Sequence, residues 1–388
     1  MTGPLEGIRV IDMTAMISGP LATMLLADQG ADVIKIEPPE GDLVRRMGVG
    51  QHGLSATFLS ANRGKRSVVL DLKSQAGQEA LRRLVATADV FVQNFRPGAA
   101  ERMGIGEAAL RAIRPDLVYV SISGFGETGP YAGKRVYDPV IQALSGLAAI
   151  QADRDTGRPR MIRTIIPDKL TAMTAAQAIT AALFARTRTG TGQHVRLAML
   201  DAMIAFLWPE GLVTLTFPDQ AHAPARAQLS QDLVYRTSDG YITVGAVSDA
   251  EWTGLCRALG QPQWLDDPRF NTPAGRVANA AERLAQTQTV LATNTSAHWL
   301  EVLYTEDVPC APILGRDDLL AHPQIVENAI VEELDWPDVG RARQPRPAAR
   351  FSATPAHIGG QAPKLGADTA AVLLEIGYEA AAIERMLR

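Results

Sequence analysis

The chain has 388 residues, of which 46% are hydrophobic and 21% are charged, and its formal net charge is −4. This length favours one large and one smaller domain, and the slightly acidic charge disfavours nucleic acid and anionic membranes as partners. Two distant cysteines, Cys256 and Cys310, are typical of a reducing compartment and disfavour a structural zinc site. No secretory leader is evident, and no apolar run approaches the roughly 18 residues of a membrane span, so we expect a cytoplasmic protein.

Short β-branched runs alternate with amphipathic segments in the first third of the chain. We expect strands at 8–14, 32–37, 67–73, 89–95 and 117–123, and helices at 20–31 and 76–88. Repeated strand, helix and strand predict an α/β fold with a doubly wound parallel sheet, whose ligands bind at the carboxyl ends of the strands.

The second half of the chain changes in character. After the long helix that follows Asp168 we expect a strand within 192–200, a helix from 201 to about 208, and a linker or mobile loop at 217–230. We then expect a hairpin at 232–247 and helices near 249–259, 277–292 and 296–304. The chain should end with an irregular Pro-rich stretch from about 320 and a final helix within 365–378. The hairpin and the helices that follow it are typical of a small α+β domain.

The segment GFGETG, residues 124–129, matches a dinucleotide-binding fingerprint and leaves an NAD-dependent oxidoreductase open. In that fingerprint the third glycine lies in the first turn of a helix. Here Pro130, Tyr131 and Gly133 follow, and helical patterning resumes only near Asp138. The pattern therefore indicates a loop beside a site.

The basic segment NRGKRS, residues 62–67, has two interpretations. Together with Lys73 and Arg96, its Arg and Lys side chains could hold a phosphorylated ligand at the ends of neighbouring strands, or they could form a solvated turn with scattered charges. The six histidines show no metal-binding spacing, and no G-x-S-x-G motif is present, so we predict no metal site and no serine nucleophile.

Asp168 is the only carboxylate between Arg163 and Gln193, and it precedes an Ala-rich helical run. As a helix cap, it would accept the amides of Leu170 or Thr171. As a nucleophile, a carboxylate held ionised at a helix N-terminus could attack a carbonyl and form an acyl intermediate. These residues alone leave both interpretations open.

Several stretches together resemble the class III CoA-transferase family, also called CaiB/BaiF, which includes formyl-CoA transferase and α-methylacyl-CoA racemase. They are residues 4–42, residues 58–74 with 89–104 (DVFVQNFRPGAAERMG), residues 121–148, and residues 167–195, with DVPCAPIL and LGADTAAVLLEIGY near the end. The resemblance therefore extends over essentially the whole chain.

The resemblance implies a Rossmann-like large domain built from both ends of the chain and an interlocked homodimer. We expect the large domain at 1–215, a small α+β domain at 216–320, and a C-terminal segment, 321–388, that returns to the large domain. It also implies that Asp168 attacks an acyl-CoA and carries CoA to a carboxylic acid as an aspartyl thioester. The partners would be acyl-CoA and small carboxylic acids, with no metal or further cofactor.

The family's racemases use a His-Asp pair, whereas Tyr137 stands where that His would be, beside Asp138. A tyrosine with a reference pKa of about 10 is a poor base for an α-proton at neutral pH. The resemblance therefore favours a transferase, with a racemase-like epimerase as the alternative.

The remaining site residues follow from the resemblance alone. The expected ligand contacts are Ile17 through its backbone, Lys73, Asn94, Phe95, Arg102 and Arg135, with Tyr137 and Asp138 lining the reaction chamber. Ile17 and Pro38 replace a glutamine and an arginine of formyl-CoA transferase, and residues 217–230 lack its glycine-rich loop, so formate and oxalate are not the expected substrate pair.

Overall fold

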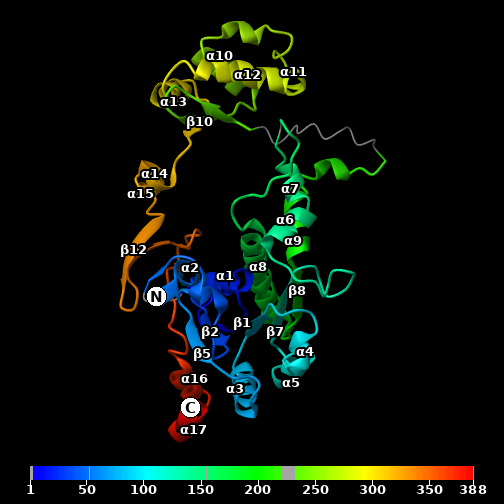
Figure 1. The fold of residues 1–388 in the computed structure, drawn as a ribbon, viewed down its shortest axis with the longest axis vertical. Coiled ribbons are helices and arrows are strands. Elements are labelled where there is room, and N and C mark those ends of the chain that lie inside the picture. The colour runs from blue at the N-terminus through cyan, green and yellow to red at the C-terminus, as the bar shows by residue number, and fades with distance from the viewer. Residues whose placement is uncertain (1–2, 52, 154, 220–231, 388) are drawn as a thin grey trace. The chain divides into compact units, whose positions relative to one another are not determined.

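The computed structural model describes residues 3–51, 53–153, 155–219 and 232–387 (Figure 1). The chain forms two compact units: the residues up to Pro209 together with those from Ala329 onward, and the intervening residues Glu210–Asn328. The sequence-based boundaries, after residues 215 and 320, fall a little away from these. Most of the expected linker at 217–230 lies outside the described residues.

The large unit contains a six-stranded sheet in which all neighbouring strands are parallel, as predicted. In spatial order the strands are β5 (Arg66–Val69), β2 (Asp32–Glu37), β1 (Arg9–Met13), β6 (Val90–Gln93), β7 (Val118–Ser123) and β8 (His194–Ala198). The chain winds outward from β1 in one direction and then from β6 in the other. This is the Rossmann order, and its switch point lies between β1 and β6.

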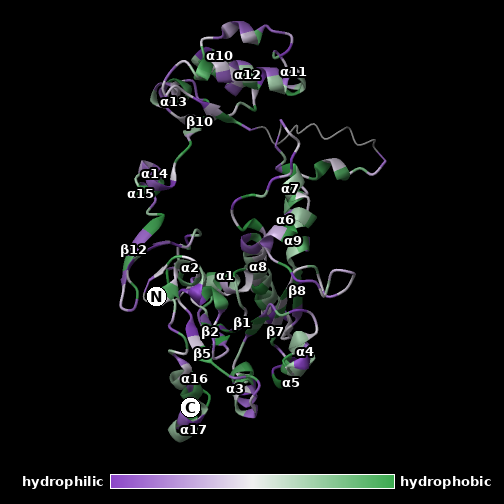
Figure 2. Ribbon diagram, in the orientation of Figure 1, coloured by the Kyte–Doolittle hydropathy of each residue, from purple (hydrophilic) through white to green (hydrophobic). Residues whose placement is uncertain are grey.

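Helices cover both faces of the sheet because the strand side chains alternate between two apolar clusters. Val10, Val33 and Val90 pack with helices α1 (Ser18–Ala27) and α8 (Ile166–Thr189). Ile11, Ile34 and Phe91 face the opposite cluster, which includes α3 (Gln75–Ala86) and α16 (Thr369–Glu375). Figure 2 shows the apolar character of α1. Burial on both faces explains why the strands read as nearly continuous hydrophobic runs.

The other elements of the large unit are short. They are η1 (Leu43–Arg46), β3 (Gly50–Gln51), β4 (Leu54–Ser55), α2 (Ala56–Asn62), α4 (Ala99–Arg102), α5 (Glu107–Ile113), α6 (Asp138–Leu144), α7 (Leu147–Ile150), α9 (Met199–Leu207), β12 (Val331–Trp336), β13 (Gly340–Pro345) and α17 (Ala380–Leu387).

Two expectations for the large unit are wrong. The stretch expected to be irregular contains the β12–β13 hairpin, in which Glu333 pairs with Arg341 and Arg343 across the strands. These charged strands show no apolar alternation that would predict them. The strand expected to run to residue 73 ends at Val69, because the chain turns and Ser74 caps α3 by accepting the Gly77 amide at 3.0 Å.

The small unit is α+β, with an antiparallel sheet in the order β11-β10-β9. Its elements are η2 (Val213–Leu215), β9 (Val234–Arg236), β10 (Tyr241–Val244), α10 (Asp249–Ala258), η3 (Pro262–Leu265), α11 (Pro273–Ala278), α12 (Ala280–Leu291), α13 (Ser296–Thr305), β11 (Cys310–Pro312), α14 (Arg316–Leu319) and α15 (Pro323–Glu327). The predicted hairpin is confirmed, whereas the helix predicted at 277–292 is divided at Asn279. None of the described helices has both the length and the hydrophobicity needed to cross a membrane.

Candidate active site

A small cavity lies where the switch point of the sheet predicts a ligand site. Its volume is about 170 Å³, and loops after β1, β6 and β7 contribute to it together with the start of α8. The lining residues are Met16, Ile17, Ser18, Asn94, Phe95, Arg96, Pro97, Ile122, Ser123, Gly124, Ala132, Lys134, Val136, Tyr137, Asp168 and Met199. Five of the predicted site residues are therefore brought together: Ile17, Asn94, Phe95, Tyr137 and Asp168.

Asp168 lies in the first turn of α8 and lines the cavity together with Ser18, whose hydroxyl group lowers the pKa of the Asp168 carboxyl group. The N-cap position of α8 is Ile165, where no side chain caps the helix. The backbone N–H of Asp168 donates instead to Asp138 Oδ2 at 3.2 Å. The helix-cap interpretation of Asp168 is therefore wrong, because Asp138 supplies the carboxylate that receives an amide of this turn.

The environment of Asp168 makes its carboxyl group unusually basic. Burial, followed by repulsion from the Asp138 carboxylate, raises the pKa of Asp168 to about 6, against the lowering effect of the Ser18 hydrogen bond. The helix terminus, expected to keep this group readily ionised, is therefore outweighed by burial and by Asp138. At neutral pH the group is still largely ionised, and its raised pKa makes the carboxylate a stronger nucleophile than an exposed one.

Asp138 is buried behind Asp168 rather than among the residues that line the cavity. Gln142, one turn later in α6, donates to Asp138 Oδ1 at 2.6 Å and accepts the Ile162 amide at 3.0 Å. These bonds connect the start of α6 with the chain leading into α8. Asp138 is thereby held beside the reactive carboxyl group, while its neighbour Tyr137 is 62% exposed and lines the cavity.

Asn94 joins the two loops at the switch point. Its Oδ1 atom accepts the Ala15 amide at 3.0 Å, and its Nδ2 atom donates to the Ala15 carbonyl oxygen at 2.8 Å. The next amide, of Phe95, donates to Gln93 Oε1 at 2.7 Å. These bonds fix the backbone on both sides of the cavity.

A second cavity, of about 540 Å³, adjoins the same loops. Its lining residues are Met13, Thr14, Ala15, Lys35, Ile36, Glu37, Pro38, Pro39, Glu40, Gly41, Asp42, Leu43, Leu70, Asp71, Leu72, Lys73, Phe95 and Met103. Phe95 lines both cavities. The predicted contact Lys73 belongs to this second cavity, and its side chain is exposed.

Two predicted contacts lie outside both cavities. Arg102 is exposed at the end of α4, next to Met103 of the second cavity, and Arg135 is exposed beside Lys134 of the first. Ser18 and Lys134 were not predicted as site residues, whereas Arg96 was named only as a possible phosphate contact. Ser18 follows β1, so the rule that ligands bind at the carboxyl ends of strands could have found it.

Both interpretations of the basic segment NRGKRS are wrong. Arg63 and Lys65 are buried in ion pairs with Asp28 and Asp12, respectively. Arg66 pairs with Asp32 and Glu375. These cations therefore hold the fold together and are neither a phosphate-binding loop nor a solvated turn.

The GFGETG segment lies between β7 and α6, and the described residues from 124 to 137 contain no helix. Gly124 packs so closely against Val136 that an added Cβ atom would approach the valine side chain to 2.4 Å. The segment is thus a loop, as its sequence context indicated, and it contributes Gly124 to the first cavity instead of opening a pyrophosphate-binding helix.

Comparison with known proteins agrees with the geometry of the site. The family model described as CoA-transferase family III matches residues 5–369. The succinyl-CoA:glutarate CoA-transferase of Mus musculus is 34% identical, covering 99% of this chain and 89% of its own length. The succinate–glutarate CoA-transferase of Agrobacterium fabrum is 36% identical, covering 96% of each chain.

A solved structure of a CAIB/BAIF family protein from Brucella suis is 33% identical to this chain, with a TM-score of 0.83. The match covers 97% of this chain and 100% of the Brucella suis chain. This chain therefore belongs to the class III CoA-transferase (CaiB/BaiF) family and is a CoA-transferase that acts between carboxylic acids.

Proposed function

We propose that the enzyme transfers CoA from an acyl-CoA to a free carboxylic acid through a covalent intermediate on Asp168. The observation that carries this proposal is the position of the Asp168 carboxyl group. It lines a small cavity at the switch point together with Ser18, and its pKa is raised to about 6. A partly desolvated carboxylate of this kind is suited to attack a thioester carbonyl.

The first half of the reaction places CoA on the enzyme. The Asp168 carboxylate attacks the acyl carbonyl of the donor, the C–S bond breaks, and a mixed anhydride and a CoA thiolate form. The thiolate then attacks the Asp168 carbonyl of the anhydride. This releases the donor acid as a carboxylate and leaves an aspartyl-CoA thioester.

The second half reverses these steps with the acceptor. The acceptor carboxylate attacks the aspartyl thioester, forming a new mixed anhydride and again freeing the CoA thiolate. The thiolate attacks the acceptor's acyl carbon, so that acceptor acyl-CoA leaves and the Asp168 carboxylate is restored. Protons need not be gained or lost in the net exchange.

Two helix N-termini meet at this cavity. Ile17 and Ser18 lie at the start of α1, and Asp168 lies in the first turn of α8. The positive dipole ends of such termini stabilise negative charge, even in α8, where the Ile166 and Asp168 amides are already bonded to Thr164 and Asp138. They would support the oxyanions that form on the acyl and aspartyl carbonyl groups during each attack.

The two cavities suit the two ends of an acyl-CoA. The cavity of about 540 Å³ has the volume typical of a site for a cofactor-sized group, and Lys73 there can meet a phosphate. Phe95 lies between it and the smaller cavity that holds Asp168. We infer that the nucleotide occupies the larger cavity and that the thioester reaches Asp168 past Phe95.

The first cavity, at about 170 Å³, fits an acid with few carbon atoms. Arg96 and Lys134 line it, and each can pair with a second carboxylate at the far end of an acid. The relatives from Mus musculus and Agrobacterium fabrum carry succinate and glutarate in their names. We therefore infer that the substrates are small dicarboxylic acids.

We also propose that the enzyme works as a homodimer. Helices α6, α8 and α9 expose apolar side chains that a monomer would leave in water: Val140, Leu144, Met173, Phe184 and Phe206. Exposed apolar groups gathered on neighbouring elements mark an interaction surface. The interlocked arrangement expected from the family resemblance would cover them.

Mass spectrometry of exchanged CoA esters tests the proposed reaction. The protein is incubated with succinyl-CoA or acetyl-CoA and a pool of free mono- and dicarboxylic acids, and new CoA esters are identified. The expected result is transfer of CoA to small dicarboxylic acids, and Asp168→Asn should abolish this transfer. Asp201→Asn is the control and should leave the transfer unchanged, since Asp201 is an exposed aspartate on α9 that lines neither cavity. Exchange that persists in Asp168→Asn would overturn the proposal.

A further inference from the structure

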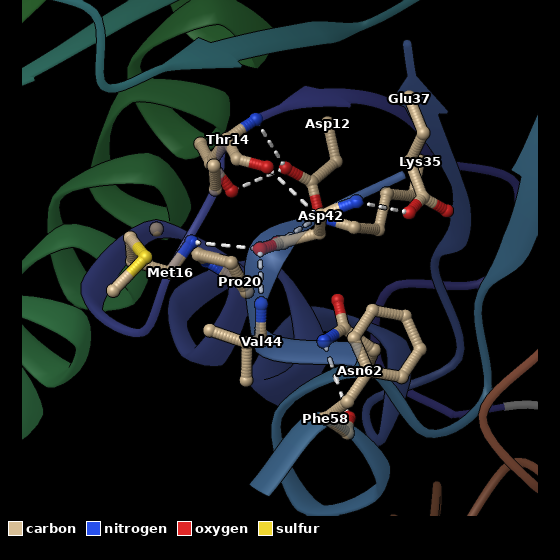
Figure 3. A network of polar contacts seen from close by, with 12 residues as sticks. Asp12, Thr14, Met16, Pro20, Lys35, Glu37, Asp42, Val44, Phe58 and Asn62 are labelled. Carbon is tan, nitrogen blue, oxygen red and sulfur yellow. Dashed lines mark hydrogen bonds and ion pairs between the residues drawn. The ribbon is translucent and has the colours of Figure 1, made fainter. Parts of the chain in front are cut away.

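A group of buried charges lies beneath the loop that joins β1 to α1 (Figure 3). The Lys35 side chain is fully buried, and its Nζ atom donates to the Thr14 carbonyl oxygen at 2.8 Å and to Asp42 Oδ2 at 3.1 Å. Asp42 is also buried, and its Oδ1 atom accepts the amides of Met16 at 3.4 Å and Val44 at 3.1 Å. Lys35 and Asp42 therefore hold this loop at two successive points.

A second buried pair fixes the strand end from which the loop leaves. Asp12 Oδ1 accepts the Thr14 amide at 2.9 Å, and Asp12 Oδ2 accepts from Lys65 Nζ at 2.8 Å. Lys65 also donates to the Pro20 carbonyl oxygen in the first turn of α1 at 2.8 Å. Burial alone would raise the pKa of Asp12, but Lys65 and Lys35 outweigh it and hold this pKa below its usual range.

The loop needs such support because its backbone is in an uncommon conformation. Met16 has a φ of 68°, in the left-handed region that non-glycine residues seldom adopt. Ala15 is held through both its N–H and its C=O by Asn94. Side chains are thus bonded to the backbone of three successive residues, Thr14 to Met16. These side chains come from β1, from β2, and from the segments that follow β2 and β6.

The loop ends at the residue that contacts the reactive carboxyl group. Two residues after Met16, Ser18 lies near the Asp168 carboxyl group and lowers its pKa. Ile17, Ser18 and Asp168 line the same cavity. A change in the Met16 backbone would therefore displace the hydroxyl group and the first amides of α1 from Asp168.

We propose that Lys35, through its bonds to Thr14 and Asp42, is a positioning residue that sets the β1–α1 loop so that Ser18 meets Asp168. This inference rests on the proposed role of Asp168. Lys35 does not touch the reacting atoms, and its effect reaches them through the loop. A buried ion pair contributes little net stability compared with apolar groups of similar volume, so its value here lies in fixing one loop conformation.

The test removes both charges together, because removing only one would leave the other buried and unpaired. In the variant Lys35→Met with Asp42→Asn, the asparagine keeps an oxygen for the Val44 amide, so the cap of the following turn is preserved. A matched control is Arg63→Met with Asp28→Asn. This pair is similarly buried in the large unit but contacts the β12–β13 hairpin through Gln344 and not the loop.

The two double variants should lose similar stability yet differ in catalysis. We expect kcat of the Lys35 and Asp42 variant to fall about 10- to 100-fold, since a small displacement of a positioned group costs this much. Its KM for acyl-CoA should change by less than about threefold. The Arg63 and Asp28 variant should keep a nearly normal kcat at temperatures where it is folded.

The pH profile distinguishes positioning from general destabilisation. The groups that act on the pKa of Asp168 are Ser18 on α1 and Asp138 on α6, and the titratable residues Arg96, Lys134 and Tyr137 line the same cavity. Loss of the Ser18 bond raises the pKa of Asp168, so the acid limb of kcat should move to higher pH in the Lys35 and Asp42 variant and in Ser18→Ala. Combining the two changes should add little further shift, because both remove the same bond.

Each outcome has a separate meaning. The positioning role would be overturned if the Lys35 and Asp42 variant kept its acid limb and had the same kcat as the Arg63 and Asp28 control. It would also be overturned if the shifts of this variant and of Ser18→Ala were fully additive. Asp168→Asn is assayed alongside. If that variant keeps exchange activity, the proposed function fails, whereas its inactivity beside a normal Lys35 and Asp42 variant would reject the positioning role alone.

Discussion

At the scale of single residues, the site places a carboxyl group where its charge is costly. Asp168 is largely removed from water and lies near the Asp138 carboxylate, and only Ser18 offsets these effects through a hydrogen bond. Sites that perform chemistry often retain groups that reduce the stability of the fold. The raised pKa therefore has a consequence for stability as well as for reactivity.

We predict that Asp168→Asn stabilises the protein above pH 7. The folded pKa is raised from 3.8 to about 6, so between these values the folded state binds more protons than the unfolded state. Stability therefore falls as pH rises through this window, and the loss is fully present above about pH 6. After allowing for partial solvent screening, we expect a gain of about 1 kcal/mol in the free energy of unfolding.

Urea unfolding at pH 8 and pH 4 measures this difference. The gain should be present at pH 8 and absent at pH 4, because Asp168 is protonated in the folded state at pH 4 and its charge no longer imposes a cost. Asp201→Asn, at an exposed position, serves as the control. Destabilisation by Asp168→Asn at pH 8 would show that the carboxylate supports the fold.

Single residues also show how far a sequence can predict a site. The resemblance placed Asp168, Asn94 and Tyr137 around one cavity, because the order of the strands brings their loops together. It could not reveal that Asp138 lies behind Asp168, because that contact depends on how α6 packs against the start of α8. Nor could it show that Lys35 and Lys65 are buried, because lysine is seldom fully buried unless it is paired.

At the scale of elements, α6 and α8 form the support for the reactive group. Asp138 begins α6 and accepts the amide of Asp168 near the beginning of α8. Their helical patterns were visible in the sequence, and so were the strands, because a doubly wound sheet buries long apolar runs. The β12–β13 hairpin was missed because its charged strands show no apolar alternation. Helix α17 is amphipathic, but at 8 residues it is too short for its periodicity to stand out in the sequence.

We predict that Asp138→Asn moves the acid limb of kcat to lower pH. Repulsion from Asp138 contributes to the raised pKa of Asp168, so removal of that charge should lower it. The asparagine keeps an oxygen for the Asp168 amide, so the start of α8 should be preserved. The shift should be opposite in direction to that of Ser18→Ala, and a limb that stays in place or moves upward in Asp138→Asn would contradict this account.

At the scale of the whole molecule, the order of six strands explains where the site lies. The reversal between β1 and β6 opens a crevice in which Asn94 can bond to Ala15, and both cavities lie along this edge. The NAD-dependent oxidoreductase that GFGETG left open is wrong, because the chain belongs to a CoA-transferase family. A short glycine motif fits many loops, whereas the order of several long segments specified one fold.

We predict that the enzyme is a dimer that persists on dilution to nanomolar concentration. An interlocked pair could not separate without unfolding, so its apparent affinity would exceed that of an ordinary interface. Sedimentation velocity across this range should show a single dimeric species. Phe206 on α9 is 58% exposed, and Phe206→Glu should hinder assembly of the dimer. A stable, folded monomer of the wild-type protein would contradict this prediction.

The covalent intermediate on Asp168 is the central claim, and trapping it is the most direct test. The protein is incubated with succinyl-CoA, treated with hydroxylamine or borohydride, digested and mapped by mass spectrometry. An aspartyl thioester would be converted to a hydroxamate or an alcohol on the peptide that contains Asp168, and Asp168→Asn would carry no such label. Label that maps to another residue, or exchange without any labelled Asp168 peptide, would contradict the mechanism.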